Sequence, residues 1–321
     1  MDFTLDDTQR EIARLTAQVL DREAGTPWKA LREAGLLALP VPERLGGDGL
    51  GVLEVAVVLT EIGRRAADVP ALAWASSVLP IARFGTPEQQ DELLTGDLLV
   101  TVALSEPSAP LPSAPRTTAR PDGERFLLSG TKICVPSATK ADRILVTADR
   151  GVFVVDAADA RISGSTVRLA ETPGRLLGDV TSGALYLHAL AAACALGDGV
   201  LAGALDLTVK HVGTRHQFGK PLSAFQSVAC HVADVYIASR TLHLATIAGC
   251  LDPADLSTAA YWLAAEVLPA VHTCHHLHGG LGLDITYPMH RFYGMAKELT
   301  RFVGGVDHRL SVLAEEEHRV R

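Results

Sequence analysis

Two short segments in the last third of the sequence carry side chains suited to holding a dinucleotide. The first runs from Arg215 to Gln226 and reads RHQFGKPLSAFQ. Its arginine offers fixed, forked N–H donors that match a diphosphate, as the point charge of a lysine would not. Phe218 can pack its ring against the edge of an aromatic base, Gly219 permits close backbone approach, and Gln226 can offer its amide to a ribose or phosphate. An ordinary basic loop between two helices is the plainer alternative.

The second segment is rich in histidine and glycine. It begins at His276 and reads HLHGGLGL. Gly279 and Gly280, at the end of an expected helix, let backbone amides approach a diphosphate, and His276 can donate a hydrogen bond. The same region could suggest a metal site formed by histidines, which are His272, His275, His276 and His278. Because no cysteine or carboxylate is placed to complete such a site, we expect no bound metal.

The chain divides into three regions with different hydrophobic periodicity, and these regions must position the two segments. Residues 1–97 show helical periodicity interrupted by prolines and glycines. Residues 98–185 change to short, strand-like runs separated by turn residues, and residues 186–321 return to long helical patterns. The expected fold is therefore mostly α, with an N-terminal helical domain, a central small β-barrel or sandwich, and a C-terminal helical bundle over these three ranges.

Local signals fix several of the expected elements. Thr86 followed by Pro87 predicts a helix that starts with an N-cap and a proline at its first position. Two hairpins are expected in the β region, one turning at residues 121–123 and one at residues 148–151. Later in the chain a helix is expected to bury one face formed by residues at helical spacing, which are Val232, Val235, Tyr236, Ser239 and Leu242.

One apolar run, from Leu185 to Val209, approaches the length of a membrane span. Asp198 and Asp206 lie within it, and a charge in the bilayer core costs roughly 2.5–3.5 kcal/mol. We therefore expect a helix that is buried inside the bundle, and no membrane association.

The composition limits the class of protein. With 48% hydrophobic and 21% charged residues over 321 positions, the chain has enough apolar surface for a globular core. A net charge of -8 argues against a nucleic-acid partner, which would require a basic face. The five cysteines are odd in number and never spaced as CxxC, and the acidic start Met1–Asp7 has no apolar core of a signal peptide. We expect a cytoplasmic protein with reduced thiols.

The segment from Arg215 to Gln226 resembles the signature of the acyl-CoA dehydrogenase family, Arg-x-x-Phe-Gly-x-Pro-[Leu/Ile]-x-x-[Phe/His]-Gln. The segment from His276 is similar to the family element Gln-x-x-Gly-Gly-x-Gly, with histidine in place of glutamine, and residues 36–50 are similar to an N-terminal turn of the family. The resemblance covers nearly the whole chain. It implies a helix–β–helix fold ending in a four-helix bundle, assembly into tetramers, and FAD as cofactor. In the family a carboxylate removes the α proton of an acyl-CoA thioester while hydride passes from the β carbon to FAD.

The catalytic glutamate of that family has no counterpart here. Val303 occupies its usual position, and Ala189 occupies the position where a minority of the family carries it. Removal of an α proton needs a base with a pKa raised by an apolar pocket, and neither side chain can accept a proton. Rescue by Glu266 or Glu298 is the alternative, although both are more typical of helix-surface or paired carboxylates.

The β region departs from the family as well. Ser105–Ala109 keeps the start of the family's Ser-Glu-Pro element, but the Gly-Ser-Asp that usually follows is replaced by residues 110–113, PLPS. The family strand along the flavin ring reads CVPSA from Cys134 here, and its proline lacks an N–H. Leu187 and Leu190 replace polar residues expected to contact CoA.

The losses therefore fall on groups that serve a subunit's own flavin and thioester. The retained residues match family positions that reach across a dimer interface to the FAD held mainly by the neighbour; they are Arg215, Phe218, Gln226, His276, Gly279 and Gly280. This pattern resembles the small subunits of actinobacterial α2β2 acyl-CoA dehydrogenases that act on steroid side chains. It implies a larger catalytic subunit as partner, which binds most of the acyl-CoA. The alternatives are a self-sufficient homomeric dehydrogenase with a relocated base, and a scaffold that binds neither FAD nor CoA.

Overall fold

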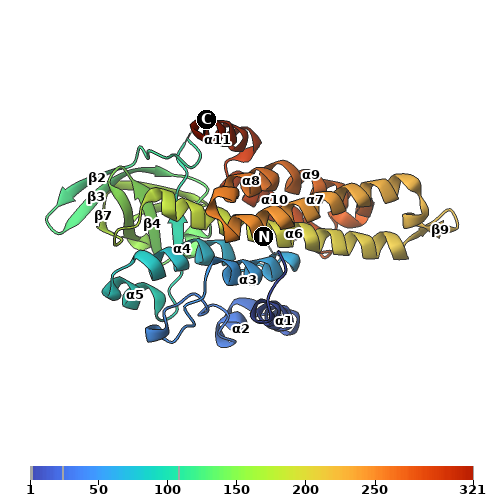
Figure 1. The fold of residues 1–321 in the computed structure, drawn as a ribbon, viewed down its shortest axis with the longest axis horizontal. Coiled ribbons are helices and arrows are strands. Elements are labelled where there is room, and N and C mark those ends of the chain that lie inside the picture. The colour runs from blue at the N-terminus through green and yellow to red at the C-terminus, as the bar shows by residue number, and fades with distance from the viewer. Residues whose placement is uncertain (1–2, 24, 108, 321) are drawn as a thin grey trace. The chain divides into compact units, whose positions relative to one another are not determined.

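The computed structural model describes residues 3–23, 25–107 and 109–320 (Figure 1). Met1, Asp2 and Ser108, which entered the sequence analysis, lie outside the described residues. Contacts within the chain group it into two compact units, each built from segments that are far apart in sequence. The first unit comprises Met1–Pro27, Ala56–Asp68 and Ala193–Arg321, and the second comprises Trp28–Val55 and Val69–Ala192.

The order of elements is helices, then strands, then helices, which confirms the expected mostly helical fold with a central sheet (Figure 1). The first helices are α1 (Asp7–Arg22), α2 (Pro27–Glu33), α3 (Val52–Arg64), α4 (Ala71–Phe84) and α5 (Pro87–Leu94). The main strands are β1 (Val100–Ala103), β2 (Thr118–Asp122), β3 (Arg125–Lys132), β4 (Arg143–Ala148), β5 (Gly151–Asp156), β6 (Arg161–Ser163) and β7 (Thr166–Leu176). The C-terminal part contains α6 (Ser182–Thr214), β8 (His216–Gln217), β9 (Lys220–Pro221), α7 (Gln226–Leu251), α8 (Leu256–Trp262), α9 (Leu268–His278), α10 (Met289–Phe302) and α11 (Gly305–Val320).

The start of α5 confirms the local signal in the sequence. The hydroxyl of Thr86 accepts a hydrogen bond from the backbone N–H of Gln89, and the side chain of Gln89 accepts one from the N–H of Thr86. This capping box, with Pro87 at the first helical position, satisfies backbone donors that the first turn would otherwise leave unpaired.

Seven strands form one sheet in the order β1-β4-β5-β7-β3-β2, with β6 paired to β7. The pair β1–β4 is parallel, and both expected hairpins, β2–β3 and β4–β5, are antiparallel. The first hairpin turns later than predicted, because Asp122 still pairs with Arg125 and the turn itself contains Gly123, whose φ is +62°. A residue without Cβ reaches that left-handed conformation at low cost, so glycine sets the turn and the preceding proline stays in the strand.

The sheet curls around one apolar core. Ala103 on β1 and Ala119 on β2, the two ends of the strand order, belong to the same buried cluster as Leu128, Val146 and Phe153. Hydrogen bonding does not close the sheet, so within the described residues it is a small open barrel rather than a complete one.

Helix α6 is the central apolar helix, and 83% of its most apolar window is buried. In the first unit its glycines allow close contact with α3. A Cβ added at Gly199 would lie 2.0 Å from the carbonyl oxygen of Thr60, and one at Gly203 would lie 2.0 Å from that of Arg64. The apolar run is therefore buried core, as the aspartates within it suggested.

Two details of the C-terminal helices differ from expectation. Tyr236, predicted on the buried face of α7, is 56% exposed, whereas Val235 and Leu242 are buried. The helical spacing therefore predicted the buried face of α7 correctly but wrongly included Tyr236 in it. The apolar pattern of residues 261–275 alone predicts one long helix, but a π-helical turn, Leu263–Val267, interrupts it between α8 and α9.

Candidate cofactor-binding site

The segment from Arg215 to Gln226 forms a tight hairpin between α6 and α7 (Figure 1). His216 pairs with Pro221 and Gln217 pairs with Lys220, which leaves Phe218 and Gly219 as the two turn residues. Both have positive φ, +52° and +80°. This is the turn that matches the twist of a two-residue hairpin, but phenylalanine is an uncommon occupant of its first position.

The turn presents Phe218 outwards. Its side chain is 92% exposed, and the nearest ring, Phe225, lies edge-on with centroids 6.3 Å apart. The ammonium of Lys220 lies 4.2 Å from the centre of the Phe225 ring. A large aromatic ring left in water, on a backbone conformation that disfavours it, is typical of a surface that is completed by a ligand or partner.

Arg215 and Gln226 flank this turn and are both exposed. The backbone of Arg215 is fixed, because its N–H donates to His211 and its carbonyl accepts from Leu222. Its guanidinium has no hydrogen-bond or ion-pair partner among the described residues, and the same holds for the amide of Gln226. Free forked donors on a fixed backbone fit a phosphate-bearing ligand.

The second candidate segment lies at the end of α9. Gly279 has φ +56° and ψ -137°, a conformation suited to glycine. A Cβ added at Gly279 or Gly280 would meet no atom within 4 Å, so the space in front of this backbone is open. His276 is exposed at the same end of the helix. Open backbone next to a donor side chain suits a diphosphate, as the sequence suggested.

Two ring pairs bring the two segments together. His211 on α6 stacks on His278 on α9, with centroids 4.5 Å apart and planes inclined by 22°. His231 on α7 lies 6.4 Å from His276, ring centre to ring centre. The end of α6, the start of α7 and the end of α9 are thus neighbours, and the predicted cofactor-contacting residues share one end of the helical bundle.

His278 has a structural role that the sequence did not reveal. It is 4% exposed, and its Nδ1 lies 2.8 Å from the carbonyl oxygen of Cys274. Burial lowers the pKa of His278, and burial together with the charge of Arg215 lowers the pKa of His211. A stack of two neutral imidazoles therefore supports the backbone before Arg215 and Gly279. Across the described residues no three His, Cys, Asp or Glu side chains gather where they could hold a metal ion.

The two positions where the sequence resemblance predicts the family's glutamate are buried and apolar. Val303 is fully buried where α10 ends, before Gly304 and Gly305, and Ala189 is 1% exposed on α6. Glu298 is exposed on α10, so no apolar pocket surrounds it. Glu266 is half-buried on the π-helical turn. Neither carboxylate has a hydrogen-bond or ion-pair partner among the residues described, so of the two ordinary roles expected for them, helix-surface or paired, the exposed Glu298 fits the first.

The retained Ser-Glu-Pro element carries a buried ion pair that the sequence analysis missed. Glu106 is 2% exposed, and Lys132 on β3 is fully buried with its Nζ 2.8 Å from the carboxylate. Lys132 also contacts the hydroxyl of Thr147 at 3.0 Å, and the carboxylate accepts from the backbone and hydroxyl of Thr117 and from the N–H of Arg116. Burial alone raises the pKa of Glu106, but these donors outweigh it and hold the pKa at about 2. Lys132 is the last residue of β3, and its neighbours in the sequence, Gly130 and Thr131, give no sign that it is buried.

The stretch that follows β3 is irregular. Cys134 and Ser137 have positive φ, +54° and +49°, and the carbonyl of Pro136 accepts from the hydroxyl of Thr101 at 2.5 Å. The strand ends at Lys132. The residues that replace the family's flavin-side strand therefore form a turn.

Comparisons with known proteins show the family to which the chain belongs. The protein-family model "Acyl-CoA dehydrogenase, N-terminal domain" matches residues 5–97, and "Acyl-CoA dehydrogenase, C-terminal domain" matches residues 179–316. The chain is 44% identical to acyl-CoA dehydrogenase FadE28 of Mycobacterium tuberculosis, covering 98% of both chains. It is 34% identical to FadE27 of the same organism, covering 96% of this chain and 91% of that one.

Two solved structures are similar over nearly the whole chain. One is described as the Tcur3481-Tcur3483 steroid ACAD G363A variant, with a TM-score of 0.90, 34% identity and coverage of 99% of this chain and 100% of the other. The other is the ChsE4-ChsE5 complex from Mycobacterium tuberculosis, with a TM-score of 0.91, 30% identity and coverage of 99% of each chain. Each is named after two different components.

Proposed function

Because this chain belongs to the acyl-CoA dehydrogenase family, which typically binds FAD, we propose that it is the non-catalytic subunit of a hetero-oligomeric acyl-CoA dehydrogenase. The observation that carries the proposal is a contrast between two sets of positions. Val303 and Ala189 put buried apolar groups where the family carries its base. Arg215 and Gln226, at the predicted cofactor contacts, keep exposed polar groups without partners in the described chain.

The residues at the end of the bundle fit a dinucleotide. Arg215 would neutralise the diphosphate with two parallel donors, and Gln226 would donate to a phosphate or ribose oxygen. Phe218 would cover an aromatic or ribose face and lose its exposure to water. The open backbone at Gly279 and Gly280 would admit the diphosphate, and His276 would add a donor. FAD, when bound, supplies the acceptor for the hydride that leaves the substrate's β carbon.

A partner subunit would supply the rest. The base that removes the α proton, most contacts to the flavin ring and most contacts to the acyl-CoA would come from a larger acyl-CoA dehydrogenase in an α2β2 assembly. The likeness to two-component structures, one of them described as a steroid ACAD, supports a different partner and a steroid side-chain CoA ester as substrate class. The irregular turn after β3 supports the same division, since Pro136 offers no N–H to a flavin.

The test is to purify the chain alone and together with a larger acyl-CoA dehydrogenase subunit. We expect the chain alone to lack bound flavin, and the complex to contain one FAD per heterodimer and to dehydrogenate an acyl-CoA ester. A stable homotetramer with one FAD in each subunit and turnover of its own would contradict the proposal.

A second function has one observation in its favour. Glu266 is half-buried on a π-helical turn and has no partner in the described part of the chain, and such turns are frequent at functional sites. If it is the base of a self-sufficient dehydrogenase, Glu266→Gln abolishes turnover and leaves FAD content unchanged. If the chain is a scaffold that binds neither ligand, Arg215→Ala leaves the flavin content of every assembly unchanged.

A further inference from the structure

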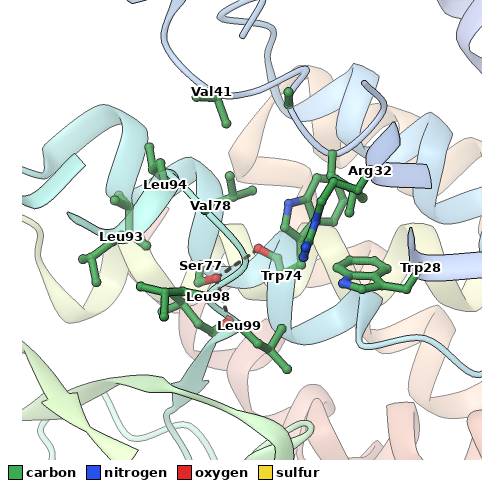
Figure 2. A pocket seen from close by; sticks show the side chains of 15 residues that line it. Trp28, Arg32, Val41, Trp74, Ser77, Val78, Leu93, Leu94, Leu98 and Leu99 are labelled. Carbon is green, nitrogen blue, oxygen red and sulfur yellow. Dashed lines mark hydrogen bonds between the residues drawn. The ribbon is translucent and has the colours of Figure 1, made fainter. Parts of the chain in front are cut away.

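A cavity of about 150 Å³ lies in the second unit, among α2, the segment after it, α4, α5 and the start of β1 (Figure 2). None of its lining residues belongs to the two candidate cofactor segments. A dry apolar cavity of roughly this size is large enough to bind benzene in other proteins. The cavity therefore has room for a single six-membered ring.

Two indole rings form one side of the cavity. Trp28 on α2 and Trp74 on α4 meet edge to face, with centroids 6.1 Å apart and planes inclined by 75°. Trp74 is 9% exposed and Trp28 is half-buried, so part of the latter ring faces the opening. Two aromatic rings in this edge-to-face arrangement favour contact with a third flat ring, which a ligand could supply.

The remaining interior is closed by aliphatic side chains and one satisfied hydroxyl. Leu93 and Leu94 of α5 lie opposite the tryptophans (Figure 2). Ser77 is the polar side chain inside, but its hydroxyl already makes hydrogen bonds to the carbonyl oxygens of Val100 at 2.9 Å and Ala73 at 3.0 Å. Apart from the indole N–H groups of Trp28 and Trp74 and the guanidinium of Arg32, the lining side chains are aliphatic or already hydrogen-bonded, so an apolar body is the group that the interior accommodates.

The cavity has one charged lining residue, Arg32. In Figure 2 it lies on the same side as Trp28 and Trp74. Its side chain is 37% exposed and is paired with Asp97, whose side chain is 85% exposed. Exposed ion pairs contribute little to stability, so a ligand carboxylate in better geometry can replace Asp97 on the guanidinium.

We propose that this cavity binds a small aromatic carboxylate, with the ring against Trp28 and Trp74 and the carboxylate on Arg32. The size of the cavity limits the apolar part to one ring. The lone cation at its opening selects an anion over a neutral molecule of the same shape. All its lining residues lie within the second unit, and none of them belongs to the two candidate cofactor segments.

The experiment titrates the full chain with phenylacetate, with its neutral isostere phenylacetamide and with acetate, which lacks the ring. The chain contains three tryptophans, and the third, Trp262, lies on α8 in the first unit. In a Trp262→Phe background all tryptophan fluorescence therefore comes from the cavity walls. We expect saturable quenching by phenylacetate, binding roughly tenfold weaker for phenylacetamide because the charge-assisted hydrogen bonds are lost, and no response to acetate.

Two variants of the ion pair make the test specific. Arg32→Gln is expected to weaken phenylacetate binding about tenfold and to leave phenylacetamide binding unchanged. Asp97→Asn, a change on a largely exposed side chain, removes the competing carboxylate and is expected to tighten phenylacetate binding. Equal binding of the acid and the amide, or no binding of either, would overturn the proposal. If Arg32→Gln does not fold, unchanged or weaker binding by Asp97→Asn overturns it.

Discussion

Charged side chains have opposite surroundings in the core of the β region and at the tip of the α6–α7 pair. In the core, Glu106 and Lys132 are buried, and every strong donor or acceptor around them is used within the chain. At the tip, Arg215 and Gln226 are exposed with no partner in the described chain, and Phe218 stands in water. The first region is complete by itself. The second has the chemistry of a surface that something else completes.

This difference is the one expected between residues that stabilise the fold and residues that we propose bind a cofactor. A buried charge is tolerated only when its partners are in place, so its surroundings must be supplied by the chain itself. An arginine without an ion-pair partner and a phenylalanine that is 92% exposed contribute little to folding, and the turn that holds Phe218 carries a backbone penalty. Changes in the two regions should therefore affect different measurements, and the predictions below test that separation.

The largest expected effect is on stability, in the β core. Lys132→Met leaves the carboxylate of Glu106 buried without its cation, and breaking a buried pair from one side costs about 3–5 kcal/mol. Urea unfolding measures the loss. The matched control is the double variant with Glu106→Gln, which should recover much of the loss because no charge then stays buried. A loss below about 1 kcal/mol would mean that water reaches the pair and that this core is not self-contained.

Acid should act on Glu106 and on His278 in different pH ranges. The pKa of Glu106 falls from 4.5 to about 2 in the fold, so its contribution to stability is present above pH 4.5 and is lost as the pH drops towards 2. Burial lowers the pKa of His278 below its ordinary value of 6.5. As the pH falls below 6.5, the unfolded chain takes up a proton on this histidine more readily than the folded chain, so the free energy of unfolding decreases. Urea midpoints measured over pH should decline in both ranges. His278→Phe should reduce the upper decline, which His211, His188 and His308 share because burial lowers the pKa of each, and should leave the lower decline unchanged.

Local sequence signals predicted the elements well, because their physics is local. The capping box at Thr86 and the two hairpins need only residues a few positions apart. The burial of the run from Leu185 followed from its apolar length and its two aspartates. Periodicity failed at Tyr236, because spacing alone cannot tell how wide a stripe the neighbouring helices cover. The π-helical turn at residues 263–267 also had no recognisable signal in the sequence.

The contacts that build the candidate site were harder to predict. The stack of His211 on His278 joins residues on two helices, and the pair of Glu106 with Lys132 joins a loop to a strand. Nothing in the spacing of these residues specifies the pairing, since it depends on how the chain returns to itself. The motif residues Arg215 and Gly280 were recognisable because each lies in a short segment whose residue types and spacing suit a dinucleotide. The residues that pack against these segments in the fold could not be recognised in this way.

A smaller effect is expected at the tip, and on binding rather than folding. Arg215→Ala should change the free energy of unfolding, measured in urea, by less than about 0.5 kcal/mol, because the guanidinium has no partner in the described chain to lose. In a complex with a catalytic subunit it should weaken flavin retention roughly tenfold or more, since charge-assisted hydrogen bonds to the diphosphate are lost. Flavin absorbance after gel filtration measures this. Arg215→Lys is the matched control and should retain part of the affinity, because the charge remains without the fork.

The smallest expected effect has the opposite sign, which makes it the sharpest test of the contrast. Phe218→Asn places asparagine before Gly219 in a turn with two positive φ values, the pair this turn favours, and removes an exposed ring. The isolated chain should gain about 0.5–1 kcal/mol in urea unfolding, since asparagine tolerates the left-handed region better than phenylalanine. The complex should lose flavin affinity at the same time, because the ring no longer covers the cofactor. If this change destabilises the chain, Phe218 stabilises the fold. The contrast between a β core that serves folding and a tip that serves binding would then not hold for Phe218, its most exposed ring.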